Sequence, residues 1–576
     1  MKNAIRFKRV VLSCTIVFLF LSLSHSHCYA ITKAELFFEL FTELGYAVKE
    51  ENPSLPIDVP PTHRYAREIG TSVRYGLIPE SVFLPDDPIN RRDAVLLSLK
   101  MMGWGFETSL YQTLSSLPEL AGSGDPVFFF AAEMIPPAPK DILLDGPTPL
   151  SNSGRDALIS WVRACRESVR WNRVVSHRGT DLILYRQGVA RPGEAGTPRQ
   201  DNPVGAPACE PLYIAAVAVQ PKLIDQRIAF AGKLGQIKAS LTEFVESYEA
   251  IAAVNGGFFA GGRPLGTMLL DGVFAGKPLP GRSAVGWNNQ SGKHTFGSGG
   301  ARIGVRTASG YVELTRFNVA PDMDEASLYI PGIARNAIGT AGDALELSVR
   351  DGVIVERREA TEGIHEVPEN GMLIVARGLS RNLLEELQPG STVNVVSQWD
   401  DRSFLDCTDV IQAGPMLLLN DQFTKNPETF KADVLDKRHP RTIVGSDGER
   451  VFWAVVDGRS PIHSRGATIS ETRWIAKALG LKNAINMDGG GSSQLIWRGI
   501  LINSPSDGKE RPLPYAVLML PKGAELVRRD VETSLAYPLD GEGLERDVKP
   551  SLQDDSGVTL EPQGQSGRPE TEGSPR

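Results

Sequence analysis

The sequence predicts an α+β fold in which a domain built on a mixed sheet follows a smaller helical region. Two observations support this prediction. Toward the C-terminal end, an apolar run at Val451–Val456 precedes a helical pattern from Thr468 to Gly480, and a second apolar run follows at Ala484–Met487. Near the N-terminus, amphipathic helical patterns recur at intervals of roughly sixty residues.

The C-terminal pattern is typical of a strand, a helix and a second strand. Thr468 and Glu471 have the spacing of a capping box, which places the start of the helix, and Gly480 is a plausible stop. A right-handed crossover of this length makes the two strands parallel. Asp457 and Asp488 directly follow the strands, so both carboxylates are expected at the edge of the sheet where ligands bind.

A glycine run comes directly after the second of these carboxylates. Gly489, Gly490 and Gly491 can turn tightly and present N–H groups to an anion, and Ser492 and Ser493 can add hydrogen bonds to it. The alternative is that the glycines form only a sharp loop and that the serines start the next segment. The run lacks the Gly-x-Ser-x-Gly elbow, so a serine nucleophile is not predicted.

Several short motifs follow one another along the chain. They are N-G-G-F-F at Asn255–Phe259, Gly414–Leu417, Pro440–Gly445, V-D-G-R at Val456–Arg459, D-G-G-G-S-S at Asp488–Ser493, Asn503–Asp507 and Glu510–Pro512. The series resembles the phosphodiester glycosidase family, whose animal member removes N-acetylglucosamine from mannose 6-phosphate diesters. The resemblance covers 212–520 and implies a hydrolase that cleaves a sugar 1-phosphodiester bond.

The residues suit that chemistry. A departing phosphate monoester is a stable anion, so the bond needs less general-acid help than an ordinary glycoside. The site still needs a cation for the phosphate and a carboxylate that attacks the anomeric carbon or activates water. Asp488 and Asp457 are the candidates for the carboxylate, and Arg441 and Arg511 are the candidates for the phosphate contact.

Asn255 and Gly256 are further candidates, because they follow the apolar run Ile251–Val254 and can hold a sugar hydroxyl or a phosphate oxygen. The alternative is a β-turn that directs Phe258 and Phe259 into the core. No C-x-x-C or H-E-x-x-H spacing occurs, so no metal ligand and no cofactor is predicted. A divalent cation held by carboxylates and carbonyls stays open.

The N-terminal patterns open at Ile31–Glu35, at Ile89–Asp93 and near Arg155–Ala157. With Tyr65 and Phe83–Pro85, they resemble the surface-layer homology (SLH) module, whose repeats bind secondary cell-wall polysaccharide. The third copy lacks an equivalent of Tyr65. Residues 31–170 are therefore predicted to hold three SLH-like repeats, the third degenerate, with wall polysaccharide as the partner. A generic helical domain is the alternative.

A basic stretch and an apolar run at Val10–Leu23 predict a signal peptide at residues 1–30, with an uncleaved anchor as the alternative. We expect a connecting segment with an exposed loop at 171–211, the glycosidase-like domain at 212–525 and a disordered tail at 526–576. No later segment is apolar enough to span a membrane. The mature protein is expected to be secreted and associated with the wall or cell surface.

The chain has 576 residues and a net charge of −8, which suits two or three domains and argues against nucleic acid as a partner. Beyond the signal, Cys165, Cys209 and Cys407 are too few to make the fold depend on disulfides, although Cys209 and Cys407 are a possible pair. The sequence thus predicts an exported, wall-associated glycosidase acting on a glycan phosphodiester. The alternative is a non-catalytic wall protein that binds phosphorylated glycans.

Overall fold

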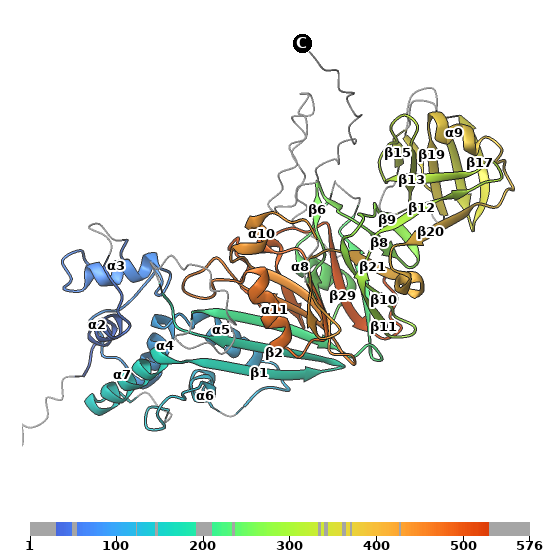
Figure 1. Ribbon diagram of the computed structural model, residues 1–576. Coiled ribbons are helices and arrows are strands. Elements are labelled where there is room, and N and C mark those ends of the chain that lie inside the picture. Colours follow the sequence, from blue (N-terminus) through green and yellow to red (C-terminus); the bar gives the residue numbers. More distant parts are fainter. Residues whose placement is uncertain are drawn as a thin grey trace, which may run out of the picture. The chain divides into compact units, whose positions relative to one another are not determined.

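The computed structural model describes residues 30–48, 54–122, 124–143, 148–191, 210–232, 237–331, 336–338, 344–359, 364–368, 371–424 and 428–528 (Figure 1). The chain divides into two units, Met1–Arg170 with Gly188–Pro192, and Trp171–Gln187 with Gly193–Arg576. Among the helices in the described ranges, none has the length and hydrophobicity that a membrane span requires. Cys165 and Cys407 are buried thiols.

Three predictions fall on segments outside the described ranges. They are the signal peptide, the Pro- and Gly-rich loop that contains Cys209, and the tail beyond Val527 and Arg528. These predictions stay untested.

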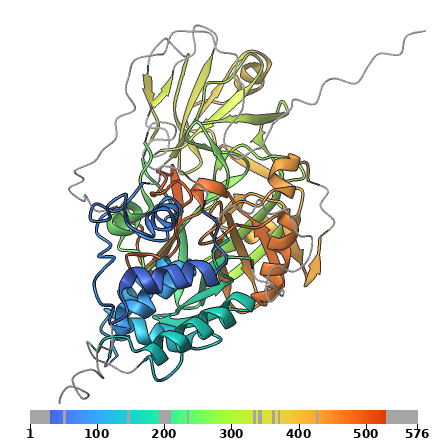
Figure 2. The same cartoon turned by 90° about the vertical axis from the view of Figure 1, so that its left-hand side faces the viewer.

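The first unit is helical in its described part (Figure 2). Its helices are α2 (Lys33–Glu43), α3 (Ala66–Arg74), α4 (Arg91–Met101), α5 (Gly105–Ser115), α6 (Pro126–Glu133) and α7 (Asn152–Glu167). Buried aromatic and aliphatic side chains such as Phe37, Trp104 and Phe130 fill the space between them.

Three of these helices begin in the same way. Thr32, Asn90 and Ser151 precede α2, α4 and α7, and each side chain accepts a hydrogen bond from the N–H group three residues further on. The cap residues also form successive bridges, Thr32 with Pro88 and Asn90 with Pro149, and the three helices contact one another. Helical segments therefore recur where the sequence pattern placed them. Their identity as a surface-layer homology module stays a prediction.

The second unit contains an eight-stranded sheet that leads to the predicted site. Its order is β1 (Arg170–His177), β2 (Thr180–Gln187), β3 (Leu212–Val219), β25 (Val451–Val456), β24 (Arg441–Ser446), β26 (Asn483–Asn486), β22 (Met416–Leu419) and β23 (Gln422–Phe423). Helix α11 (Ile469–Ala478) buries Ile469, Ile475 and Ala476 in the same core cluster as Phe452 and Ile443 of the sheet.

The crossover from β25 through α11 to β26 has the predicted direction. Both strands pair antiparallel with β24, so they run parallel to each other with β24 between them. Asp457 and Asp488 therefore follow strand ends at the same edge of the sheet, as predicted. Because β24 runs the other way, its first residue, Arg441, also lies at that edge.

Two five-stranded sheets complete the part of the second unit near the site. One has the order β28 (Ile500–Leu501), β27 (Leu495–Trp497), β5 (Ala252–Asn255), β29 (Tyr515–Pro521) and β4 (Ile224–Phe230). Helix α8 (Leu241–Tyr248) packs on it. The other has the order β11 (Lys293–Ser298), β10 (Ser283–Asn288), β21 (Asp409–Gln412), β8 (Met268–Leu270) and β9 (Val273–Gly276).

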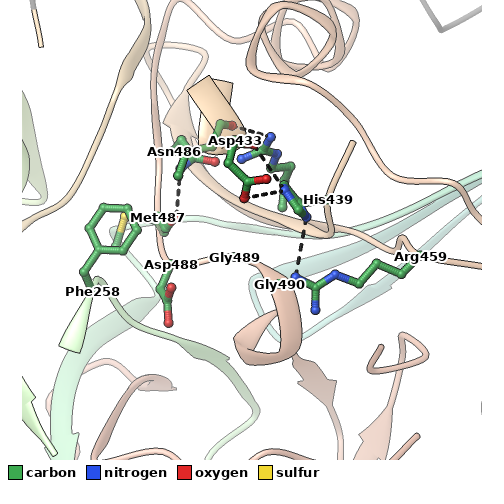
Figure 3. A pocket seen from close by; sticks show the side chains of 11 residues that line it. Phe258, Asp433, His439, Arg459, Asn486, Met487, Asp488, Gly489 and Gly490 are labelled. Atoms are coloured by element: carbon green, nitrogen blue, oxygen red, sulfur yellow. Dashed lines mark hydrogen bonds and ion pairs between the residues drawn. The ribbon is translucent and has the colours of Figure 1, made fainter. Parts of the chain in front are cut away.

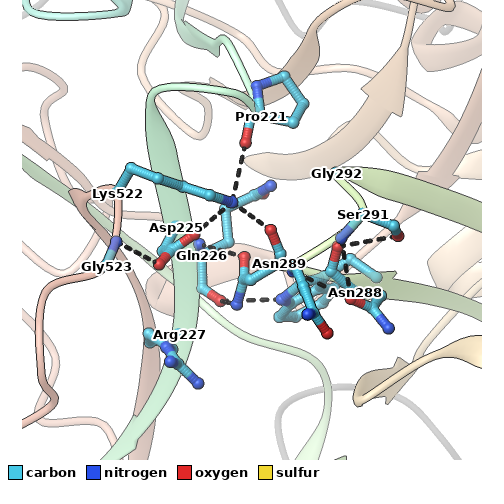
Figure 4. A network of polar contacts seen from close by, with 12 residues as sticks. Pro221, Asp225, Gln226, Arg227, Asn288, Asn289, Ser291, Gly292, Lys522 and Gly523 are labelled. Carbon is cyan, nitrogen blue, oxygen red and sulfur yellow. Dashed lines mark hydrogen bonds and ion pairs between the residues drawn. The ribbon is translucent and has the colours of Figure 1, made fainter.

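Gln226 lies in a network of polar contacts, part of which Figure 4 shows, and its side chain links the three sheets. The amide of Gln226 on β4 accepts a hydrogen bond from Trp453 Nε1 at 2.6 Å, and its Nε2 lies 2.6 Å from His294 Nε2. Burial lowers the pKa of His294 to about 4, so its ring stays neutral. At the end of β29, Lys522 pairs with Asp225 at 2.9 Å.

Residues 301–399 form a separate seven-stranded sheet, drawn in yellow-green in Figure 1. Its order is β17 (Val353–Glu359), β16 (Leu345–Arg350), β19 (Gly371–Ala376), β14 (Ala326–Tyr329), β13 (Tyr311–Phe317), β12 (Ala301–Arg306) and β20 (Asn394–Trp399). This sheet is mixed, because β13 and β14 pair parallel. The predicted mixed sheet therefore occurs here. The sheet at the predicted site instead pairs antiparallel from β2 to β23 over the described strands, because β24 separates the two parallel strands.

Gly458 is expected to be essential for the turn that follows β25. A Cβ atom there would lie 2.6 Å from Pro440 N and 2.9 Å from both His439 C and Gly466 Cα, all backbone atoms that cannot rotate away. We expect Gly458→Ala to destabilise the fold by about 1–3 kcal/mol and to lower the melting temperature. Gly105→Ala is the control, because Gly105 begins a helix and its Cβ would meet only Lys100 Cγ at 3.7 Å. Equal melting temperatures of the two variants would contradict this account.

Candidate active site

A pocket lies at the edge of the eight-stranded sheet where β25 and β26 end (Figure 3). Its cavity volume is about 40 Å³, which is smaller than the roughly 300–1,000 Å³ typical of small-molecule sites. The residues that line it are Phe258, Asp433, Val434, His439, Arg441, Arg459, Asn486, Met487, Asp488, Gly489 and Gly490. The structure thus brings Asp488, Arg441 and two of the predicted glycines into one cavity.

A buried amide holds the backbone of Asp488 in place. Its carbonyl oxygen accepts a hydrogen bond from Asn255 Nδ2 at 2.8 Å. Asn255 Oδ1 in turn accepts from Thr442 Oγ1 at 2.9 Å and from Gln494 N at 3.2 Å. Asn255 is 1% exposed, so this amide supports the residue that lines the pocket instead of lining the pocket itself.

The glycine loop after Asp488 packs tightly on the neighbouring chain. Gly489 allows a close approach, because a Cβ there would lie 2.8 Å from Pro440 O. Gly490 has φ +61° and donates its N–H to Pro440 O at 3.0 Å. A short 3₁₀ turn, η2 (Gly490–Ser492), follows. The loop is therefore held in one shape by backbone contacts.

The remaining glycine and serine candidates lie behind the pocket lining. Gly256 faces the ring of Tyr515, and Gly491 faces the Asp507–Arg511 ion pair. Ser493 Oγ lies 3.1 Å from Thr442 Oγ1, within hydrogen-bond distance. The Ser492 hydroxyl is buried, and no hydrogen-bond partner for it occurs within the described ranges. Their contact with a ligand stays a prediction.

Asp457 is a buried hydrogen-bond acceptor outside the pocket lining. Its carboxylate accepts from Asn503 Nδ2 at 2.8 Å and Ser504 N at 2.7 Å, and it lies 2.8 Å from His463 Nε2. The side chain is 1% exposed. These contacts assign Asp457 a role in holding the loop of Asn503 and Ser504, and its predicted catalytic role stays untested.

Arg441 lines the pocket, but backbone carbonyls bind much of its guanidinium. Nε donates to Ala467 O at 2.7 Å, and Nη2 donates to Val434 O at 2.7 Å and Lys437 O at 2.9 Å. Burial lowers the pKa of Arg441 to about 9. Arg511, the second predicted phosphate ligand, lies outside the pocket lining and donates from Nε to Asp507 at 2.8 Å.

Arg459 and His439 were not among the predicted site residues, although both lie in or beside quoted motifs. His439 Nε2 lies 3.2 Å from the Asp433 carbonyl oxygen, and its Nδ1 lies 3.5 Å from Arg459 Nη2. Burial lowers the pKa of His439, and the positive charges of Arg441 and Arg459 lower it further. Because the ordinary value is 6.5, the ring is neutral at pH 7.

Asn486 is a third residue that the sequence analysis missed. Its Nδ2 donates to Gly414 O at 2.9 Å and to Met487 O at 2.8 Å, which fixes the orientation of the amide. No hydrogen-bond partner for its Oδ1 occurs within the described part of the chain. A buried acceptor without a partner costs roughly 1–3 kcal/mol, which is typical of a position that a ligand or water completes.

In Figure 3, Phe258 lies on one side of the Asp488 carboxylate, and His439 and Arg459 lie on the other. The pocket therefore has an aromatic wall and a cationic wall, with a carboxylate between them. Within the described ranges, no group of three or more His, Cys, Asp or Glu residues is arranged to hold a metal ion. The arrangement suits a ligand with an apolar face and an anionic group.

Comparison with known proteins gives one short match to a curated protein. The chain is 44% identical over 79 residues to the SPbeta prophage-derived uncharacterized protein YomE of Bacillus subtilis, which covers 13% of this chain. The match spans 12% of the length of that protein.

Solved structures of three proteins are similar to larger parts of the chain. The match to a hypothetical protein from Synechocystis covers 61% of this chain and 77% of that protein's chain, with 19% identity and a TM-score of 0.46. A putative exported protein from Burkholderia pseudomallei covers 62% and 97% at 18% identity and a TM-score of 0.48. The zebrafish N-acetylglucosamine-1-phosphodiester alpha-N-acetylglucosaminidase catalytic domain, auto-inhibited by its pro-peptide, covers 61% and 87% at 16% identity and a TM-score of 0.30.

A family model identifies the domain that contains most of the pocket. It is the phosphodiester glycosidase model, and it matches residues 343–520. That range includes the motifs from Gly414 to Pro512, and with them every lining residue except Phe258. The resemblance that the ordered motifs indicated is confirmed, and residues 343–520 match the phosphodiester glycosidase family.

Proposed function

We propose that the protein is a hydrolase that cleaves a sugar 1-phosphodiester bond. The observation that carries the proposal is that Asp488 and two arginines, Arg441 and Arg459, line one pocket in the segment that matches the family. A glycosyl phosphodiester needs both groups. The carboxylate acts at the anomeric carbon, and the arginine charge neutralises the phosphate.

In the proposed reaction, Asp488 attacks the anomeric carbon or activates a water molecule toward it. The bond between that carbon and the phosphate oxygen breaks, and its electron pair leaves with the phosphate. Water supplies the oxygen that the sugar gains and the proton that is released. Asp433, the other carboxylate of the lining, is exposed and pairs with Lys437 at 2.5 Å, so it suits this role less well.

The sugar is proposed to lie on the side of Phe258 and Met487. Both side chains are buried around the pocket, and an apolar wall suits the C–H face of a sugar ring. Asn486 Oδ1 supplies an acceptor for a hydroxyl or an acetamido N–H group on that ring. An N-acetylglucosamine phosphodiester is compatible with this arrangement.

The alternative is a wall protein that binds a phosphorylated glycan without cleaving it. The same pocket would serve that function, because arginines and an aromatic wall bind the ligand in either case. The two proposals differ in the need for the Asp488 carboxylate. Turnover requires its negative charge, whereas binding of an anionic ligand does not.

We expect Asp488→Asn to lower turnover at least about a hundredfold, because a positioned acid–base group or nucleophile typically contributes that much. The melting temperature should change little, since removing an active-site charge seldom destabilises a fold. The measurement is sugar released from UDP-N-acetylglucosamine and from model sugar phosphodiesters, with and without chelator.

Asp421→Asn is the matched control, because Asp421 is an exposed aspartate that pairs with Lys477. It should keep full turnover. Retained activity in Asp488→Asn together with a collapsed melting temperature would mean that Asp488 only caps a turn. Binding of sugar phosphate by a wild-type protein that releases no sugar would favour the non-catalytic alternative.

We further propose that the protein is exported and that its N-terminal unit binds cell-wall polysaccharide. The support is the resemblance of the repeats and the common start of α2, α4 and α7. Phe38 and Tyr65 stack with ring centroids 4.4 Å apart, and Arg64 lies 4.7 Å from the Tyr65 ring. Both rings are partly exposed, which is typical of aromatic side chains that contact sugars.

The full-length chain is expected to sediment with purified cell wall and to stay in solution when the secondary polysaccharide has been stripped. Tyr65→Ala should weaken sedimentation about fivefold or more, as expected for a central aromatic contact. Phe423→Ala is the control, because Phe423 is 42% exposed but belongs to the other unit. Equal binding to stripped and intact wall would refute the proposal.

A further inference from the structure

We infer that Arg459, which the sequence analysis did not single out, is the residue that binds the phosphate group of the substrate. The inference rests on the proposed function and assigns its anion subsite to one side chain. It also orients the substrate, with the phosphate at the Arg459 side of Asp488 and the sugar at the Phe258 side.

The first argument is the contrast between the arginines near the pocket. Arg441 is 3% exposed and donates to three backbone carbonyls. Arg511 pairs with Asp507 and does not line the pocket. Arg459 lines the pocket and is exposed, and no ion pair within the described ranges includes it. Arg459 is therefore the exposed arginine of the three, and neither a carboxylate nor a backbone carbonyl within the described ranges binds its guanidinium.

The contacts that Arg459 does make are with neutral groups. Nη1 lies 3.5 Å from Ser506 Oγ, and Nη2 lies 3.5 Å from His439 Nδ1. The His439 ring is neutral because burial and the neighbouring arginines lower its pKa. Long contacts to neutral partners orient the guanidinium without neutralising it. A phosphate can therefore replace or join them with shorter, charge-assisted hydrogen bonds.

The backbone conformation at Arg459 sets the direction of its side chain. Arg459 has φ +64°, a region that non-glycine residues rarely adopt and that often occurs at functional sites. The preceding Gly458 is enclosed by backbone atoms of His439, Pro440 and Gly466, which holds the turn in place. The strained conformation is thus maintained by packing, and it directs the guanidinium to the pocket.

Gly490 leaves space for the Arg459 guanidinium beside the loop that follows Asp488. A Cβ atom at Gly490 would lie 3.2 Å from Arg459 Nη2, so any larger residue would press on the guanidinium. A glycine at this position lets the planar group lie against the loop that follows Asp488. A phosphate bound there would be next to the carboxylate that acts on the anomeric carbon, as a sugar 1-phosphate requires.

The test measures binding and turnover separately in the full-length chain. Asp488→Asn serves as the background for binding, so that a ligand is not consumed. Calorimetry gives the dissociation constants of N-acetylglucosamine 1-phosphate, inorganic phosphate and N-acetylglucosamine. These constants are measured for the Asp488→Asn background and for the same background carrying Arg459→Gln, Arg459→Lys or Arg302→Gln. Turnover of a sugar phosphodiester is measured for the same arginine variants with Asp488 intact.

We expect Arg459→Gln to weaken binding of both phosphate-containing ligands about 10- to 100-fold, the effect of losing charge-assisted hydrogen bonds. Arg459→Lys should recover part of this loss, because it keeps the charge but not the planar fork. Affinity for N-acetylglucosamine should stay within about twofold, which a general disturbance of the pocket would not produce. Arg302→Gln is the control, because Arg302 is an exposed arginine of the seven-stranded sheet that pairs with Glu313 at 3.0 Å, and this variant should bind all three ligands as the background does.

Two results would overturn the inference. One is unchanged phosphate affinity in Arg459→Gln, and the other is no saturable binding of either phosphate ligand to the background protein. If phosphate binding depends on Arg459 but the wild-type chain releases no sugar, the inference stands and the proposed hydrolase activity fails. Turnover that is lost in Asp488→Asn but unaffected in Arg459→Gln would refute only the role of Arg459.

Discussion

The pocket depends on the buried amide of Asn255. This side chain joins β5 of one sheet to Thr442 on β24 of another, and it holds the carbonyl of Asp488 between them at 2.8 Å. Because Asn255 is 1% exposed, water cannot replace its hydrogen bonds, and loss of the amide would leave several buried groups unpaired. The position of Asp488 is thus set by a contact between residues more than two hundred positions apart.

The charged residues at the site differ in burial and in the groups that they contact. Asp457 and Arg441 are both buried, and described backbone and side-chain groups occupy their polar atoms. Arg459 is exposed and lines the pocket, and Asp488 lines it with 5% of its surface exposed. A buried charge is stable only with partners, which accounts for the hydrogen bonds of Asp457 and Arg441.

The seven-stranded sheet at residues 301–399 has its own core and contributes no residue to the lining of the pocket as described. Tyr329, Leu373 and Val375 are buried together within it. The chain therefore leaves the site-bearing sheets after β11 and returns at β21 without changing the edge where β25 and β26 end.

Local signals in the chain were enough to predict the elements around the site. The capping box of Thr468 and Glu471 is present, and the strands end directly before Asp457 and close to Asp488, because caps, turns and apolar runs act between near neighbours in the chain. The motif order also indicated the family that residues 343–520 match.

Other features depended on contacts between distant segments. Strand β24 lies between the two parallel strands. Arg441 donates a hydrogen bond to the carbonyl of Ala467, and Asn503 donates one to the Asp457 carboxylate. Asp457 and Asp488 look alike in the sequence, as do Arg441 and Arg459. The members of each pair differ in burial and in hydrogen-bond partners. Both properties follow from packing between segments far apart in the chain, and the periodicity and spacing of residues along the chain do not encode that packing.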